Sequence, residues 1–91
     1  MEFERFEIDL DGVTDKEELH ERIKEILPCP DYYGNNLDGL YDILTEQDEG
    51  WEIVFCNWQE FAEEMPKYMD ALERMCEDAQ EESEYLEIRF E

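Results

Sequence analysis

Three segments of the chain have the residue pattern of β-strands, and helical segments separate them. Apolar and charged residues alternate over residues 5–10 and again over residues 86–91, which is typical of strands with one buried face and one solvated face. Residues 51–56 are apolar except for Glu52, and this composition favours a strand with neighbours on both sides. The second strand of the chain is therefore expected at the centre of the sheet.

Four helical patterns lie between these strands, over residues 15–27, residues 36–44, a short stretch from residue 57, and residues 66–82. Strands joined by helices pair in parallel through right-handed crossovers. If both crossovers run the same way, all helices fall on one face of the sheet. We predict an α/β fold of two layers, with a three-stranded parallel sheet of order 1-2-3, about four helices packed on one face, and a single domain over residues 1–91.

Capping residues predict where three of the helices begin. Thr14 followed by Glu17 has the spacing of a capping box, in which each side chain bonds a backbone N–H of the other. Asn36 is a suitable N-cap for the short second helix. Asn57 with Glu60 three residues later is another capping arrangement. We therefore expect helices to start directly after residues 14, 36 and 57.

The charge of the chain limits its possible partners. It has 29 acidic residues against 7 basic residues, with a formal net charge of −22. Such a charge argues against direct binding of nucleic acid or of an anionic membrane, because both would be repelled. It favours a basic partner. General solubility and adaptation to a saline cytoplasm are alternative reasons for the same acidic excess.

Location and redox state are also indicated by the sequence. Residues 1–5 lack the basic and apolar regions of a signal peptide, and no apolar run approaches membrane-spanning length. We therefore expect a cytoplasmic protein. Cys29, Cys56 and Cys76 are an odd number of cysteines in a chain with enough apolar residues for a core, so reduced thiols are expected. We expect a monomer when the protein is free.

Catalytic and metal-binding patterns are weak. The chain has one serine, Ser83, and one histidine, His20, so no Ser–His or Cys–His pair with a third orienting group can be assembled. Charged neighbours at 17, 18, 21 and 22 predict His20 to be a solvated surface residue. The cysteine spacing gives no zinc signature. We expect no enzyme, no cofactor and no specific metal site, although a hydrolase built on unpaired carboxylates remains an alternative.

Residues 32–44 break local rules that the rest of the chain follows. On the predicted short helix, Asp38 and Asp42 are stacked four positions apart, and like charges at this spacing cost an isolated helix roughly 0.2–0.5 kcal/mol. Gly39 costs about 1 kcal/mol more than alanine inside a helix. Both penalties fall on the same outward surface, and Gly39 points almost directly away from the apolar stripe, which is formed by Leu37, Leu40, Tyr41 and Leu44. Solvated aspartates are the simpler explanation, but with the Tyr-Tyr-Gly loop alongside we favour a binding site with room for a partner near Gly39.

The same segment resembles a known family. The pattern Tyr-Tyr-Gly-x-Asn-Leu-Asp-x-Leu-(aromatic)-Asp, from Tyr32 to Asp42, is similar to the central segment of the barstar family, intracellular inhibitors of the secreted ribonuclease barnase. The order and lengths of the other predicted elements also match, so the resemblance covers nearly the whole chain. It implies a two-layer barstar-like fold and an inhibitor whose carboxylates mimic RNA phosphate in the active site of a small basic ribonuclease.

The resemblance also implies a set of contact residues. Asp42 is expected to be the central contact, Asp38 to reach donors beside it, and Tyr32 to cover the catalytic histidine of the partner. Tyr41 stands where barstar has tryptophan. A second acidic contact is expected on the last helix at Asp78, with Glu77 or Glu82 as alternatives. The predicted partner-binding residues are Tyr32, Gly34, Asn36, Leu37, Asp38, Gly39, Tyr41, Asp42 and Asp78.

The identity of the partner stays open at this point. The first hypothesis is a basic secreted ribonuclease of the barnase type. The alternative is an immunity or regulatory module on the same fold that binds a different toxin or another basic cytoplasmic protein.

Overall fold

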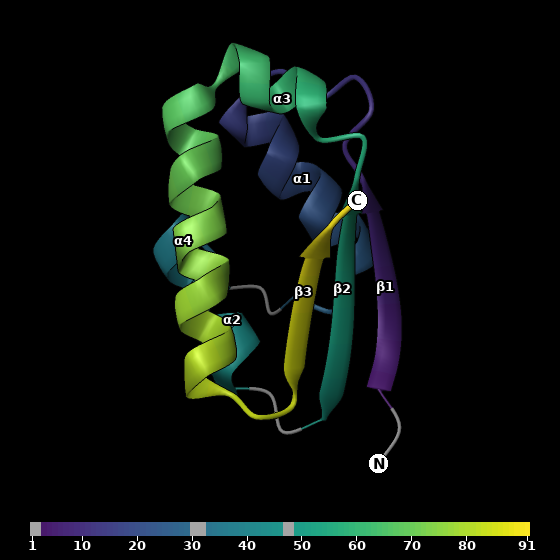
Figure 1. The fold of residues 1–91 in the computed structure, drawn as a ribbon, viewed down its shortest axis with the longest axis vertical. Coiled ribbons are helices and arrows are strands. Elements are labelled where there is room, and N and C mark those ends of the chain that lie inside the picture. The colour runs from purple at the N-terminus through teal and green to yellow at the C-terminus, as the bar shows by residue number, and fades with distance from the viewer. Residues whose placement is uncertain (1–2, 30–32, 47–48) are drawn as a thin grey trace.

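The computed structural model describes residues 3–29, 33–46 and 49–91. Three strands and four helices alternate along the chain (Figure 1). Their bounds are β1 Phe3–Asp9, α1 Lys16–Ile26, α2 Leu37–Glu46, β2 Gly50–Cys56, α3 Gln59–Glu64, α4 Pro66–Glu82 and β3 Leu86–Phe90. None of the helices among these residues is long and apolar enough to cross a bilayer.

The sheet is parallel, and its strand order is β1-β2-β3. The central strand is β2, as its nearly continuous apolar composition predicts. Ile8 of β1 pairs in register with Phe55 of β2, and Phe55 pairs in turn with Phe90 of β3. The predicted α/β fold, with order 1-2-3 and four helices, is confirmed.

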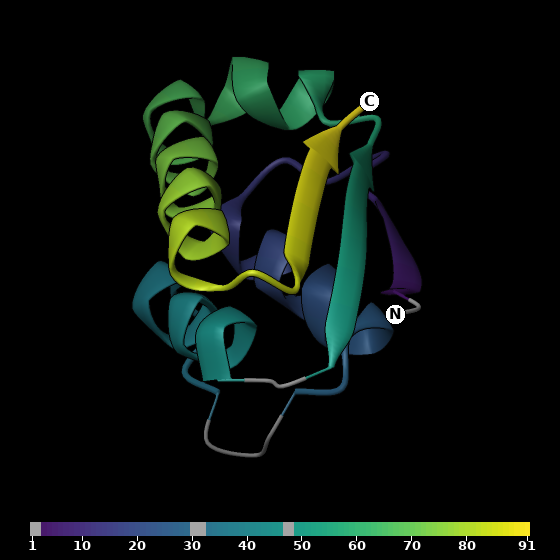
Figure 2. The same cartoon turned by 60° about the horizontal axis from the view of Figure 1, so that its bottom comes forward.

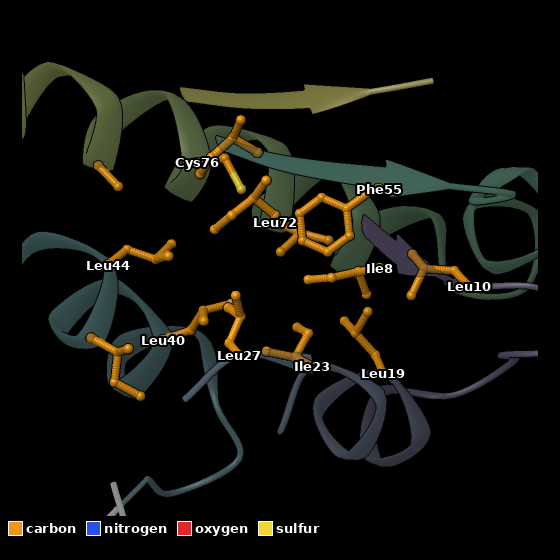
Figure 3. Close-up of a cluster of buried hydrophobic side chains, with 14 of the residues drawn as sticks. Ile8, Leu10, Leu19, Ile23, Leu27, Leu40, Leu44, Phe55, Leu72 and Cys76 are labelled. Carbon is orange, nitrogen blue, oxygen red and sulfur yellow. The ribbon is translucent and has the colours of Figure 1, made fainter. Parts of the chain in front are cut away.

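The helices cover one face of the sheet, and the core lies between the two layers (Figures 1 and 2). Figure 3 shows side chains from both layers pointing toward one another. Ile8 and Phe55 come from the sheet, Ile23 from α1, Leu40 from α2 and Leu72 from α4, and each is at most 2% exposed. This single core joins all three strands to α1, α2 and α4 and so fixes α2 against the rest of the molecule.

The opposite face of the sheet carries charged side chains in a connected set. Glu52 on the central strand accepts from Arg5 Nη1 at 3.3 Å and from Arg89 Nη2 at 2.7 Å. Val54, two residues along the same strand, is 1% exposed although it lies on this face. Its register partners are Glu7 and Arg89, and long charged side chains cover apolar neighbours with their aliphatic parts. Val54 is thus shielded from water without a second layer of helices.

Two of the predicted helix starts are wrong. The N-cap of α1 is Asp15, whose carboxylate accepts from the Glu18 N–H at 2.8 Å, and not Thr14. Asn57 does not cap α3, because its backbone is left-handed (φ 55°) and its side-chain amide donates to Asp9 Oδ1 at 2.8 Å. This hydrogen bond ties the end of β2 to the end of β1, and together with a bond from the Asp11 N–H it lowers the pKa of Asp9.

The prediction for His20 is also wrong. Its side chain is fully buried, with Nε2 2.7 Å from the Tyr68 hydroxyl and Nδ1 in a hydrogen bond to the Tyr33 hydroxyl. His20 shares the buried side of α1 with Leu19 and Ile23. The imidazole therefore joins α1 to α4 and to the segment before α2.

Candidate functional site

Asn36 fixes the junction between the loop and α2. Its side-chain oxygen accepts the Gly39 N–H at 2.7 Å, and its side-chain nitrogen donates to the Gly34 carbonyl at 3.1 Å. The Leu40 N–H completes the first turn by bonding the Asn36 carbonyl at 3.0 Å. The predicted N-cap at Asn36 is confirmed, and one side chain holds both the loop and the start of the helix.

Gly39 is half-buried against the chain's own loop. A Cβ at this position would lie 3.3 Å from Asn36 Oδ1, 3.3 Å from Tyr33 Cδ1 and 3.5 Å from the Gly34 nitrogen. From the sequence we interpreted Gly39 as leaving this side of the helix open for a partner. In the structure the chain's own loop lies there instead. Glycine is present here because the loop packs directly on the backbone of α2.

The two aspartates of α2 face solvent. Asp38 and Asp42 are both exposed, whereas the residues of α2 that enter the core are Leu40, Ile43 and Leu44. The predicted apolar stripe is only partly right, because Leu37 and Tyr41 are half-buried at its border. The aspartates therefore lie on the exposed side of α2. The opposite side of this helix packs into the core and keeps the helix in place.

Tyr41 brings acidic groups of two helices together. Burial first, and then the nearby carboxylates of Glu82, Asp78 and Asp42, raise the pKa of its phenol. Asp42 belongs to α2, whereas Asp78 and Glu82 belong to the C-terminal half of α4. We call Asp42, Asp78 and Glu82, with Asp38 beside them, the acidic patch. The patch is formed by packing α2 against α4, so its α4 members are far from its α2 members in sequence.

A groove of about 470 Å³ runs between α2 and α4, which lie side by side in both ribbon views (Figures 1 and 2). Leu37, Asp38 and Tyr41 line it from α2, and Asp78 is among its residues from α4. The structure thus places four of the predicted contact residues around one depression. Of the alternatives for the α4 contact, Asp78 lines the groove and Glu82 lies near Tyr41, whereas Glu77 belongs to neither set.

The remaining predicted residues lie in or near the loop. Gly34 and Asn36 are exposed beside the N-terminus of α2, and Tyr32 lies outside the described residues. Sequence reasoning did not find Tyr33, which is 6% exposed and links this segment to His20 through its hydroxyl. Among the residues that the structure describes, no group of three or more His, Cys, Asp or Glu side chains is arranged to hold a metal ion.

The chain is similar to known proteins over most of its length. The family model described as Barstar (barnase inhibitor) matches residues 3–91. The chain is also 38% identical over 71 residues to a Bacillus subtilis (strain 168) protein named "Putative ribonuclease inhibitor YrdF", a match that covers 72% of this chain and 74% of that protein. The matched family region includes both helices that form the acidic patch and the groove.

Proposed function

This chain belongs to the barstar family, and we propose that it inhibits a small basic ribonuclease by filling the active site of that enzyme with the carboxylates of α2. The observation that carries the proposal is the exposure of Asp38 and Asp42, one turn apart, on a helix whose N-terminus is held by Asn36. Side chains on a helix fixed in this way lose little backbone freedom on binding.

The proposed chemistry is mimicry of substrate charge. A ribonuclease concentrates arginine, lysine and histidine where the RNA phosphate binds, and a carboxylate satisfies those donors with short, charge-assisted hydrogen bonds but offers no bond to cleave. In this proposal Asp42 takes the place of a phosphate at the centre of the site, and Asp38 accepts from donors beside it. Tyr32 covers the catalytic histidine.

The α4 side of the acidic patch adds a second contact. Glu82, Asp78 and Asp42 are close enough to the half-buried Tyr41 for their charges to raise the pKa of its phenol. A basic side chain of the enzyme that lies over this ring gains both the carboxylates and a cation–π contact. Because tyrosine offers less area than the tryptophan of barstar at this position, we expect weaker binding to barnase than to the cognate enzyme.

The net charge of −22 supports the same proposal at longer range. Such a field accelerates the encounter with a basic enzyme and repels nucleic acid. In this role the chain acts in the cytoplasm, as a monomer, and gives its own cell immunity to a secreted ribonuclease.

An inhibition assay tests this proposal. Barnase and several other small basic ribonucleases are assayed for RNA cleavage with increasing amounts of the protein. We expect at least one enzyme to be inhibited at a one-to-one ratio. If none of the enzymes is inhibited, the ribonuclease proposal is wrong, and a partner of a different toxin class becomes the better hypothesis.

A further inference from the structure

The order of charges along α4 is opposite to the one that the helix dipole favours. Lys67 lies in the first turn, directly after Pro66, and this turn has no acidic residue. The last turn has no basic residue and contains Glu81 and Glu82. A helix is stabilised by the opposite arrangement, with acidic residues at its N-terminus and basic residues at its C-terminus. In a chain with 29 acidic and 7 basic residues, helix stability does not explain a lysine at this end.

Lys67 and Arg74 line the same groove as Asp38 and Asp78 of the acidic patch, whereas Asp42 and Glu82 are not among its lining residues. Arg74 Nη2 lies 3.2 Å from Asp70 Oδ2, but the Arg74 side chain is 78% exposed, so most of its five donors remain available. In the part of the chain that the structure describes, Lys67 forms no ion pair. Two of the seven basic residues of the chain therefore border the proposed binding surface.

The groove is thus polarised. Asp38, Asp70 and Asp78 contribute negative charge to its lining, whereas Lys67 and Arg74 contribute positive charge, and Asp70 is paired with Arg74. Ala71 and Met75 lie between the charged residues of α4 and add apolar surface. A partner that covers this groove displaces water from Lys67 and Arg74. The electrostatic interactions of these two cations are then stronger than in the free protein, because the local dielectric constant is lower.

We propose that Lys67 and Arg74 form a specificity contact that receives a carboxylate on the rim of the ribonuclease active site. This inference rests on the proposed function and adds the requirement that the ribonuclease has an acidic residue facing Lys67 and Arg74. The net charge of −22 attracts any basic protein, so it cannot select among basic enzymes. A pair of local cations accepts an enzyme with an acidic residue at this point and repels one with a basic residue there.

Charge reversal separates this inference from general electrostatic attraction. The variants Lys67→Glu and Arg74→Glu each change the net charge by two, from −22 to −24, which on its own speeds association with a basic enzyme. Arg5→Glu makes the same change on the open face of the sheet, away from the helices, and serves as the matched control. Association and dissociation rates are measured by surface plasmon resonance against the ribonuclease that the wild type inhibits best, and circular dichroism checks folding.

We expect Lys67→Glu and Arg74→Glu each to raise Kd at least tenfold, mainly through faster dissociation, while Arg5→Glu leaves Kd unchanged or slightly lower. Changing the facing acidic residue of the enzyme to lysine should restore binding of Lys67→Glu. If both groove variants bind as tightly as Arg5→Glu while Asp42→Ala still weakens binding, this inference is wrong and the proposed function stands. If the wild type inhibits no ribonuclease in the panel, both are wrong.

Discussion

His20 Nε2 on α1 lies 2.7 Å from the hydroxyl of Tyr68 on α4. The other ring nitrogen bonds the Tyr33 hydroxyl, so both nitrogens of a fully buried imidazole have partners. The ring of Tyr33 in turn packs against Gly39, where its Cδ1 would lie 3.3 Å from an added Cβ. A chain of contacts therefore runs from α4 through His20 to the segment that positions the proposed inhibitory helix.

Acid is expected to destabilise the fold through His20. Burial, and to a smaller degree Lys16, lowers the pKa of His20 from 6.5 to about 4 in the folded protein. Between these two pH values the unfolded chain binds a proton and the folded chain does not, so stability is complete above pH 6.5 and falls as the pH decreases toward 4. The full effect is about 3 kcal/mol in the free energy of unfolding.

His20→Gln isolates this effect, because protonation of the many surface carboxylates changes both proteins alike. Urea unfolding is measured at several pH values between 7 and 4. Wild type should lose stability relative to the variant across this range. A constant difference between the two proteins would mean that His20 does not carry the pH dependence.

The fold followed from the sequence because its signals are local. Alternating charges over residues 5–10 and 86–91, and the apolar composition of residues 51–56, each identify a strand without knowledge of its partners. The N-cap at Asn36 is local too, since its acceptor and donor lie within three residues. These features depend on spacing along the chain, which the sequence displays directly.

The α1 cap, found at Asp15 and not at Thr14, is a local error of one residue, but the errors at His20 and Asn57 involve contacts that are distant in sequence. His20 has charged neighbours in sequence, but it shares the buried side of α1 with Leu19 and Ile23, and its partner Tyr68 is 48 residues away. Asn57 adopts its left-handed backbone where Asp9, also 48 residues away, accepts its amide. The groove requires knowledge that α2 packs on α4. Sequence patterns alone do not contain these long-range pairings.

Gly39→Ala is expected not to stabilise the protein. Replacing glycine by alanine inside a helix normally contributes about 1 kcal/mol, but here the new methyl group lies 3.3 Å from both Asn36 Oδ1 and Tyr33 Cδ1. The loop must move to accept it, which offsets the gain. Thermal unfolding measures the change, and a rise in Tm of several degrees would show that the loop yields easily.

Asp42→Ala is expected to weaken ribonuclease binding by at least about 2 kcal/mol, roughly thirtyfold in Kd, because it removes the central charge-assisted contact. Its thermal stability should change little, since the side chain is exposed. Asp11→Ala is the matched control, because Asp11 is also exposed and lies in the turn after β1. Equal losses of folding and binding in Asp42→Ala would instead assign this residue a structural role.

Lys67→Glu is expected to make the free protein more stable while it weakens the complex. A carboxylate in the first turn of α4 interacts favourably with the N-terminal end of the helix dipole, and the exchange of a cation for an anion should contribute about 0.3–1 kcal/mol or somewhat more. The side chain is exposed in the groove, so packing is unaffected. Chemical denaturation measures stability and surface plasmon resonance measures binding. If stability rises and binding is lost, the wild-type lysine is retained for recognition at a cost to the helix. If stability falls, the dipole argument for Lys67 is wrong.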